Sequence, residues 1–497
     1  MRLVSLVLLV SGLLVGASND LSSLLSKRGI SFATASNSSY PNITAPYNLR
    51  FENEFQPAAV TFPETAHQVS EVIRIGSRLN YNVVARSGGH SYIANGLGGK
   101  NGSVVVDLRK FTEITVNSSN GTARVGTGNR LGDIALTLGA SGRAIPHGTC
   151  PYVGIGGHAS YGGYGFTSRM WGLTLDHIAS LEVVLANGDI VTASQDENPE
   201  LFWAKRGAGG SFGITTSIEF RTQAVPSSGV GFTYAWLMNV TDATQALDDF
   251  QEFVQSDIPA ELGPMLFFFP GSPKGYVTFG LTGGWYGGLE NLNSTLEPFL
   301  TKMPEPSNVL FQNATFVESL QFAGDGYVLP LNTSLKPDTN DTFYTKSIMT
   351  PANKTVPTAA WEGFMSYLAN EGNETSLKWA IEVEVYGGSN SAVNSVPLDD
   401  TAFAHRGSLF TFQLYVSSPN SKPPYPEDGF TFTDGLANSI TSNSPSDWDY
   451  GAYPNYIDDR LPDWQQRYYG THYQRLQSVK RAVDPSNIFT FPTSIEP

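Results

Sequence analysis

The segment Gly148-Thr149-Cys150-Pro151-Tyr152-Val153-Gly154-Ile155-Gly156-Gly157-His158 contains the single cysteine of a chain of 497 residues. Because one thiol cannot form an internal disulfide, Cys150 requires another role. A covalent bond to a cofactor is such a role, and it indicates redox chemistry. The alternative is that Cys150 is a buried spectator, because a free cysteine packs as a small hydrophobic residue.

A second glycine-rich segment with a histidine, Arg86-Ser87-Gly88-Gly89-His90-Ser91-Tyr92, places His90 60 residues before Cys150. Its two glycines leave no side chain between the backbone and a neighbouring group, so their amides can face a pyrophosphate. By itself, a Gly-Gly-His turn is more often only a turn. Glycines also continue after the cysteine motif over Ala159–Phe166, and this density allows a flat or phosphorylated ligand to approach the backbone.

Three other interpretations of the motifs are weaker. Gly154–Ala159 with Asp176 imitates a dinucleotide fingerprint, but residues 143–151 before it are not a hydrophobic strand. Gly209–Gly213 imitates the nucleophile elbow of hydrolases, but it precedes a strand rather than a helix, and no aspartate or histidine partners are identifiable. Four possible metal ligands match no zinc spacing, so we predict no metal site: His90, His147, His158 and Cys150.

Composition and charge narrow the class of protein. Hydrophobic residues make up 40% of the chain and charged residues 15%, a globular balance without a sign of long disorder. The formal net charge is −15, and no Lys/Arg run offsets it. Nucleic acids and anionic membrane surfaces both favour clustered positive charge, so we predict neither as a partner; a neutral substrate is compatible.

Residues 1–18 have the features of a secretory signal peptide. Arg2 supplies the positive start, Leu3–Val15 the apolar stretch, and Gly16–Ser18 a small-residue cleavage zone. No later segment approaches about 18 unbroken apolar residues, so we predict a soluble, secreted protein with no membrane span. Twelve sequons for N-glycans support export: Asn37, Asn42, Asn101, Asn117, Asn120, Asn239, Asn293, Asn313, Asn332, Asn340, Asn353 and Asn373.

Hydrophobic periodicity predicts an α+β protein. After a Ser/Asn-rich lead, a strand–helix–strand unit is expected over residues 59–86, and an Asn-Gly hairpin over residues 181–193. The middle of the chain alternates strand-like and helical segments, which indicates an antiparallel sheet. The tail contains one expected helix over residues 464–482, which Asp484-Pro485 ends.

These residues carry a family resemblance. The chain resembles the berberine-bridge-enzyme-like flavoproteins of the vanillyl-alcohol oxidase superfamily, and among them fungal oligosaccharide oxidases such as glucooligosaccharide and chitooligosaccharide oxidase. The resemblance covers residues 57–497. Four segments are the strongest elements: Arg86–Tyr92, Gly148–Phe166, Gly207–Ile214, and the tail from Tyr453-Pro454-Asn455-Tyr456 to Phe491-Pro492.

The resemblance implies a two-domain α+β fold. An FAD-binding domain of the PCMH type would cover residues 54–225. A substrate domain, built on an antiparallel β-sheet backed by helices, would cover residues 226–450. The segment 451–497 would return to the FAD-binding domain. We expect the protein to be a monomer.

The resemblance also implies FAD bonded twice, through its 8α-methyl group to His90 and through C6 to Cys150. Such links are thought to raise the redox potential of the flavin and to hold an open site together. Val153 lies where oxygen-permissive relatives have a small aliphatic residue and dehydrogenases have leucine, which favours an oxidase that uses O2. The other implied cofactor-binding residues are Arg86, Ser87, Gly88, Gly89, Ser91, Gly148, Gly154, Gly156, Gly157, His158, Gly163, Ile214 and Asn455.

Sugar oxidation at C1 requires removal of a hydride, which FAD accepts, and of a hydroxyl proton, which the protein accepts. By resemblance Tyr456 is the base, Glu384 is the carboxylate that assists it, and Tyr92 and Gln413 add hydrogen bonds near the reacting end. Tyr453 and Glu382 are the expected substrate residues. The products would be a lactone and hydrogen peroxide.

The strand that carries the carboxylate departs from the family. Oligosaccharide oxidases have an aromatic–Gln–Asp pattern there, whereas this chain has Ala380, Glu382 and Glu384. The missing aromatic removes a sugar-stacking surface, and Glu384 is one methylene longer than the family's aspartate at a place where errors of about 1 Å in register are costly. In the simplest alternative, both glutamates form a solvated strand face. Two other functions therefore stay open, a tailoring oxidase for phenolic or alkaloid substrates and a catalytically idle binding glycoprotein.

Overall fold

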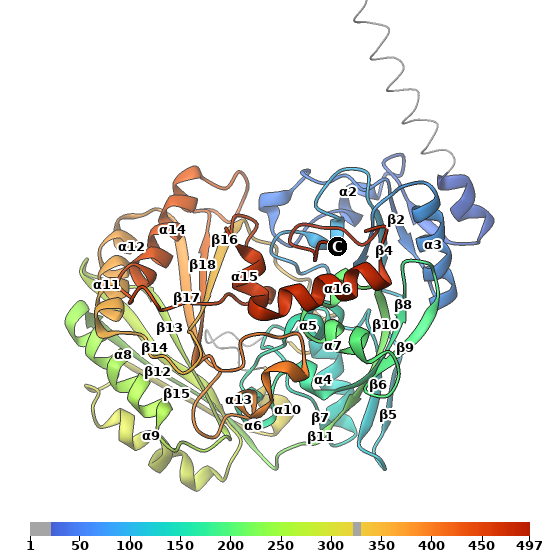
Figure 1. Cartoon of the computed structure of the whole chain (residues 1–497). Helices are drawn as coiled ribbons and strands as arrows, with labels where there is room; N and C mark the ends of the chain where they lie inside the picture. Colours follow the sequence, from blue (N-terminus) through green and yellow to red (C-terminus); the bar gives the residue numbers. More distant parts are fainter. Residues whose placement is uncertain (1–20, 322–329) are drawn as a thin grey trace, which may run out of the picture.

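Two β-rich halves lie side by side, and the C-terminal segment packs back onto the first of them (Figure 1). The structure is a computed structural model that describes residues 21–321 and 330–497. The predicted signal peptide, residues 1–18, lies outside the described residues. Within the described part of the chain, no helix is both long enough and apolar enough to cross a lipid bilayer.

A four-stranded sheet begins the N-terminal half, which comprises residues 31–224. Three of its strands run parallel, and helix α3 (Ala66–Arg78) joins two of them with its apolar face buried. This confirms the predicted strand–helix–strand unit. The antiparallel edge strand β1 lies in the Ser/Asn-rich lead, where no structure was predicted. In spatial order the strands are β1 (Ser31–Ala33), β2 (Ala59–Phe62), β4 (Val104–Asp107) and β3 (Val83–Arg86).

A five-stranded antiparallel sheet completes the N-terminal half, and its β8–β9 pair is the predicted Asn-Gly hairpin. Its strands in spatial order are β5 (Ile114–Asn117), β6 (Thr122–Gly126), β10 (Ile214–Arg221), β8 (Ile178–Val184) and β9 (Ile190–Ser194). Three helices share one hydrophobic core with it: α4 (Leu131–Ala140), α5 (Ile155–Tyr161) and α7 (Pro199–Ala208). A short ribbon pairs β7 (Arg143–Ala144) with β11 (Gln223–Ala224).

The second half comprises residues 229–450, in the middle of the chain, and contains a seven-stranded antiparallel sheet. The alternation of strand-like and helical segments in this region predicted an antiparallel sheet. Its strands in spatial order are β15 (Asn308–Ala314), β12 (Gly229–Asn239), β14 (Tyr276–Trp285), β13 (Leu262–Pro270), β17 (Lys378–Val385), β18 (Phe410–Ser417) and β16 (Phe343–Met349). Figure 1 shows the helices on the outer face of this sheet: α8 (Val240–Gln255), α9 (Leu292–Leu300), α11 (Thr358–Ala369) and α14 (Glu427–Thr441).

Strand β17 divides its side chains between the two faces of this sheet, because successive residues of a strand point in opposite directions. Its apolar set joins the core beneath the helices: Trp379, Ile381, Val383 and Val385. The alternate set faces the N-terminal half and lines a cavity: Ala380, Glu382 and Glu384. The alternation of residue types therefore fixes which side chains reach the site.

The C-terminal segment returns to the N-terminal half, where Leu476 and Val479 enter the core of the five-stranded sheet. The prediction of a single helix over residues 464–482 is wrong. Helix α15 (Trp464–Tyr469) ends at Gly470, whose φ of +47° favours glycine, and α16 (Tyr473–Val483) begins after one turn. The break redirects the chain along the N-terminal half (Figure 1).

Short helices fill the remaining connections. They are α2 (Tyr40–Ile43), α6 (Ser168–Trp171), α10 (Phe316–Ser319), α12 (Glu371–Glu374) and α13 (Ala392–Ser395).

Candidate active site

A cavity of about 770 Å³ lies between the two halves, within the usual size range of ligand pockets. Both glycine-rich motifs, strands β17 and β18 and the C-terminal segment contribute to its wall. All predicted site residues line it except two. Ile214 is buried in the core below it, while Gly213 and Thr215 on either side line the cavity. Gly163 instead donates its amide hydrogen to the hydroxyl of Tyr453 at 2.8 Å.

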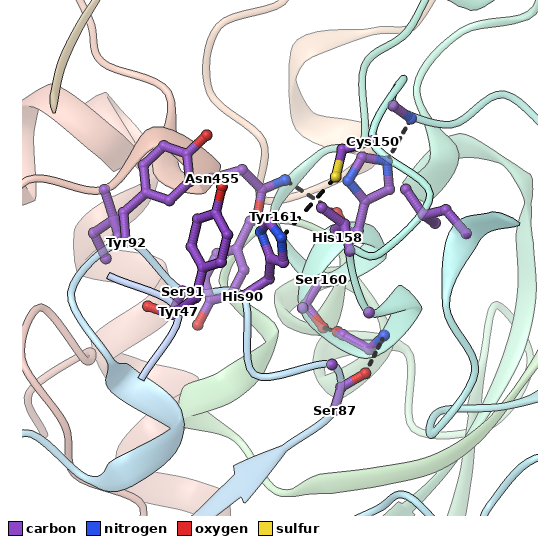
Figure 2. Close-up of a pocket in the computed structure, with 18 of the residues that line it drawn as sticks. Tyr47, Ser87, His90, Ser91, Tyr92, Cys150, His158, Ser160, Tyr161 and Asn455 are labelled. Atoms are coloured by element: carbon purple, nitrogen blue, oxygen red, sulfur yellow. Dashed lines mark hydrogen bonds between the residues drawn. The ribbon is translucent and has the colours of Figure 1, made fainter. Parts of the chain in front are cut away.

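The two motifs meet backbone to backbone. A Cβ on Gly88 would lie 2.5 Å from the amide nitrogen of Gly154, so neither position leaves room for a larger residue. Ser87 ties the two segments together, since its hydroxyl accepts from the amide of Gly156 at 3.2 Å (Figure 2). The same hydroxyl donates to the carbonyl of Thr127 at 2.5 Å. The pairing of Gly88 with Gly154, 66 residues apart in the sequence, thus joins the two motifs into one continuous stretch of the cavity wall.

Gly157 borders open space, because a Cβ placed there would meet no atom within 4 Å. A ligand can therefore approach this backbone closely. The neighbouring His158 has a structural contact, because its Nε2 accepts a hydrogen bond from the amide of Gly148 at 3.1 Å. Burial lowers the pKa of His158 to about 3, so its ring is neutral at physiological pH.

His90 and Cys150 come together at one end of the cavity, with Sγ 4.0 Å from Nε2 (Figure 2). Nε2 also lies 3.1 Å from Oδ2 of Asp338, and the ring of Tyr47 stacks on the imidazole with centroids 3.6 Å apart. Burial alone would lower the pKa of His90, but the hydrogen bonds to Asp338 and Cys150 outweigh it and raise the pKa to about 9.

Tyr456 and Glu384 also come together, and the phenol donates to Oε1 of the carboxylate at 2.7 Å. The extra methylene of Glu384 therefore does not carry its carboxylate out of reach of Tyr456. Glu384 is 5% exposed, so it is not a solvated strand face either, whereas Glu382 is half-buried on the cavity wall. No described residue forms a hydrogen bond with Oε2 of Glu384.

Burial and nearby negative charge raise the pKa of both Glu384 and Tyr456. Burial, and then the negative charge of Glu382, raise the pKa of Glu384 well above its usual value. Burial, followed by the charge of Glu384, likewise raises the pKa of Tyr456 well above its usual value. Both effects favour neutral groups, because charge is costly in a buried site and like charges repel.

Tyr92 and Gln413 form a second polar pair in the wall, with the amide of Gln413 donating to the phenol of Tyr92 at 2.7 Å. The ring of Tyr92 lies nearly parallel to that of Tyr456, with centroids 6.0 Å apart. Asn455 donates to the carbonyl of His158 at 3.1 Å and to the hydroxyl of Tyr453 at 3.0 Å, so it ties the C-terminal segment to the cysteine motif.

Comparison with known proteins identifies the family. A family model described as "FAD binding domain" matches residues 57–194, and one described as "Berberine and berberine like" matches residues 452–496. The chain is 37% identical over 459 residues to the chitooligosaccharide oxidase of Gibberella zeae, covering 91% of this chain and 89% of the relative. The chain belongs to the berberine-bridge-enzyme-like FAD-linked oxidoreductases.

Other members of the berberine-bridge-enzyme-like family agree in sequence and fold. The xylooligosaccharide oxidase of Thermothelomyces thermophilus is 34% identical over 93% of this chain and 92% of its own length. The solved structure of the glucooligosaccharide oxidase from Acremonium strictum, with its 6-S-cysteinyl, 8α-N1-histidyl FAD, matches with a TM-score of 0.88 and 30% identity. It covers 96% of this chain and 99% of the solved chain. This chain is thus an FAD-linked oxidoreductase with the α+β, PCMH-type fold.

The residues present suit the cofactor of this berberine-bridge-enzyme-like enzyme. The open backbone at Gly157 suits a flat or phosphorylated group, and His90 and Cys150 are a nitrogen and a sulfur nucleophile at one end of the cavity. Among the described residues, no group of three or more His, Cys, Asp or Glu side chains could hold a metal ion.

Sequence reasoning missed several residues in the cavity wall of this family member, among them Tyr47, Asp338 and Lys205. Tyr47 belongs to the lead that showed no periodicity, and Asp338 belongs to a loop without a motif. Lys205 is buried, and its Nζ donates to the carbonyls of Gly209 at 2.6 Å and Gly213 at 2.9 Å. Burial lowers the pKa of Lys205 to about 7. The one signal in the sequence that could have identified Lys205 was its charge at the end of the apolar run Leu201–Lys205.

Proposed function

We propose that this FAD-linked oxidoreductase is a secreted oxidase that oxidises a substrate hydroxyl, at C1 of an oligosaccharide, and passes the electrons to O2 to give H2O2. The hydrogen bond between Tyr456 and Glu384 within the cavity carries the proposal, because it provides a proton path beside the cofactor motifs. The chitooligosaccharide, xylooligosaccharide and glucooligosaccharide oxidases similar to this chain support the choice of substrate.

His90 and Cys150 would hold FAD covalently. Asn455 and the glycines of the two motifs would contact it noncovalently. When bound, FAD supplies the hydride acceptor of the reaction. Two tethers fix the position of the ring relative to Tyr456. Such positioning matters, because errors of about 1 Å at a reacting centre cost about 100-fold in rate.

Tyr456 would take the hydroxyl proton of the substrate. An unperturbed phenol has a pKa of about 10, and burial raises the pKa of Tyr456 further, so a free phenolate is not available at neutral pH. The phenol can accept a proton only if it passes its own to Oε1 of Glu384 in the same step. The raised pKa of Glu384 keeps the group neutral until the pH exceeds that pKa, but once ionised the carboxylate is a stronger proton acceptor than an ordinary one.

The remaining polar groups would orient the substrate. Oε2 of Glu384 is buried without a hydrogen-bond partner among the described residues, so a substrate hydroxyl placed there would satisfy it. The Tyr92–Gln413 pair and the hydroxyl of Tyr453 offer further hydrogen bonds on the same wall. Glu382 adds a second carboxylate, suited to sugar hydroxyls.

A tailoring oxidase for phenolic or alkaloid substrates is the second candidate. It is favoured by the replacement of the family's aromatic residue by Ala380 and of its glutamine by Glu382, both on the cavity wall. Two carboxylates on this wall, with no aromatic side chain at position 380, suit a basic substrate better than a long neutral sugar.

The proposal of secretion rests on residues 1–18 and on the sequons. The asparagine is exposed in ten of the twelve sequons. The two exceptions are half-buried and already hydrogen-bonded, Asn239 at the start of α8 and Asn373 to the carbonyl of Tyr276. A mature protein that begins near residue 19 and loses mass on treatment with an N-glycosidase would support secretion.

Anaerobic stopped-flow measurement of flavin absorbance tests the function. The purified protein is mixed with chito-, xylo- and gluco-oligosaccharides and, in parallel, with phenolic and amine-bearing alcohols. Bleaching by an oligosaccharide, followed by one H2O2 per substrate when air is admitted, supports the first candidate. Bleaching by the phenolic or amine panel alone supports the second. Ligand binding without bleaching at any pH would leave only an idle binding protein.

A further inference from the structure

The imidazole of His90 is held from two sides by residues outside its own motif. Its Nε2 lies 3.1 Å from Oδ2 of Asp338, and the His90 and Asp338 side chains are 10% and 22% exposed. Tyr47 covers the ring face, with an interplanar angle of 24°. Three separate segments therefore fix the plane of the ring and the direction in which each nitrogen points; Figure 2 shows Tyr47 beside His90.

The hydrogen bond at one ring nitrogen determines what the other can do. In a neutral imidazole one nitrogen carries the proton and the other carries a lone pair, and the hydrogen-bond partner selects between them. A carboxylate accepts hydrogen bonds but cannot donate them. Loss of one proton from the ring, whose pKa is about 9, therefore leaves the remaining hydrogen on Nε2, facing Asp338, and places the lone pair on Nδ1.

We propose that Asp338 is a positioning residue for the covalent attachment of FAD, because it directs the Nδ1 lone pair of His90 toward the 8α carbon and stabilises the positive charge that forms on the ring. This inference rests on the proposed attachment through His90. The glucooligosaccharide oxidase of Acremonium strictum carries an 8α-N1-histidyl link, which uses the nitrogen next to Cγ, Nδ1.

The chemistry of the step balances. A bond forms between Nδ1 and the 8α carbon, and one C–H bond of that methyl group breaks with loss of a proton. The two electrons of that bond would pass to the flavin, and O2 would then take them, with one proton from the methyl group and one from the imidazole, to give H2O2. During bond formation the imidazole gains a positive charge, and the carboxylate of Asp338 opposite Nε2 lowers the energy of that charged ring.

The second attachment does not depend on Asp338 in the same way. Cys150 bonds through its own sulfur, and no hydrogen bond joins Cys150 to Asp338 among the described residues. Removal of the carboxylate should therefore impair the histidyl link and spare the cysteinyl link. A general loosening of the cavity would instead weaken both.

Peptide mass spectrometry separates the two links. Cleavage after Lys and Arg places His90 in the peptide 87–100 and Cys150 in the peptide 144–169. In the wild-type holoprotein one FAD joins both peptides into a single species. Asp338→Ala and the isosteric Asp338→Asn are compared with Thr339→Ala, a control on the same loop whose side chain is exposed.

We expect both Asp338 variants to raise the ratio of free peptide 87–100 to the joined species by at least about 10-fold, the size of effect typical when the partner of a ligating histidine is removed. Peptide 144–169 should still carry FAD, and Thr339→Ala should match the wild type. Asp338→Asn decides the result if Asp338→Ala does not fold.

Three outcomes are distinguishable. Wild-type amounts of the joined species in Asp338→Asn would overturn the inference, and so would an equal loss of FAD from both peptides. If the wild-type protein itself yields both peptides without FAD, the proposed double attachment fails, which is a separate result.

Discussion

The phenol of Tyr456 and the carboxylate of Glu384 meet across a boundary between parts of the chain, with 2.7 Å between their oxygens. Tyr456 belongs to the C-terminal segment, and Glu384 belongs to strand β17 of the seven-stranded sheet. This hydrogen bond, the proposed proton path, therefore exists only when the C-terminal segment is docked.

Substitution of Tyr456 by Phe should leave substrate binding nearly unchanged and slow flavin reduction by about 10²- to 10⁴-fold, the usual contribution of a positioned general base. The ring and its stacking on Tyr92 remain, whereas the proton path to Glu384 is lost. Anaerobic stopped-flow absorbance gives the rate, and its dependence on substrate concentration gives the affinity. Tyr367→Phe, in helix α11 and far from the cavity wall, is the matched control. Near-normal reduction by Tyr456→Phe would remove Tyr456 from the role of base.

The dependence of flavin reduction on pH should report the ionisation of Glu384. Only the ionised carboxylate can accept a proton, so the rate rises as pH increases through the pKa of Glu384, which burial and the charge of Glu382 raise. Glu382→Gln removes that repulsion and lowers the pKa of Glu384, so the rise should move to lower pH. Glu384→Gln should abolish the rise and leave a low rate. A profile unchanged by Glu382→Gln would contradict this assignment.

The sequence predicted strand β17 well, because its alternation of apolar and polar residues directly encodes which face is buried. It did not predict that Glu384 reaches Tyr456, since that depends on how the C-terminal segment docks. Asp338 and Tyr47 were missed for the same reason, because a contact between distant loops leaves no periodic signal. The break at Gly470 was missed because the apolar positions keep a helical spacing on both sides of it.

The two predicted attachment points can be tested by acid precipitation. In His90→Ala or Cys150→Ala the remaining bond should keep the yellow colour in the pellet, and in the double variant the flavin should enter the supernatant. The absorbance of the pellet and of the supernatant measures how the flavin divides between them. Release from either single variant would mean that the other residue forms no bond, and retention in the double variant would exclude both residues as the attachment points.

The buried pair of Lys480 and Asp484 should anchor the C-terminal segment. Both side chains are fully buried, with Nζ 2.8 Å from Oδ2, and Nζ also donates to the carbonyl of Ser211 in the N-terminal half at 2.9 Å. Asp484→Ala leaves a buried cation without its partner, so we expect it to lower the free energy of unfolding by about 3–5 kcal/mol. Denaturant unfolding followed by tryptophan fluorescence measures the change.

A second ion pair on the same helix provides the control for Asp484→Ala. Arg475 and Glu200 are 40% and 60% exposed, and a surface pair of this kind contributes only about 0–1 kcal/mol. Glu200→Ala should therefore change stability little, and it should leave flavin reduction unchanged. Because α16 follows Tyr456 in the C-terminal segment, Asp484→Ala should also slow flavin reduction under conditions where the protein is still folded. Equal losses of stability in the two variants would show that burial of the Lys480–Asp484 pair is not what anchors the segment.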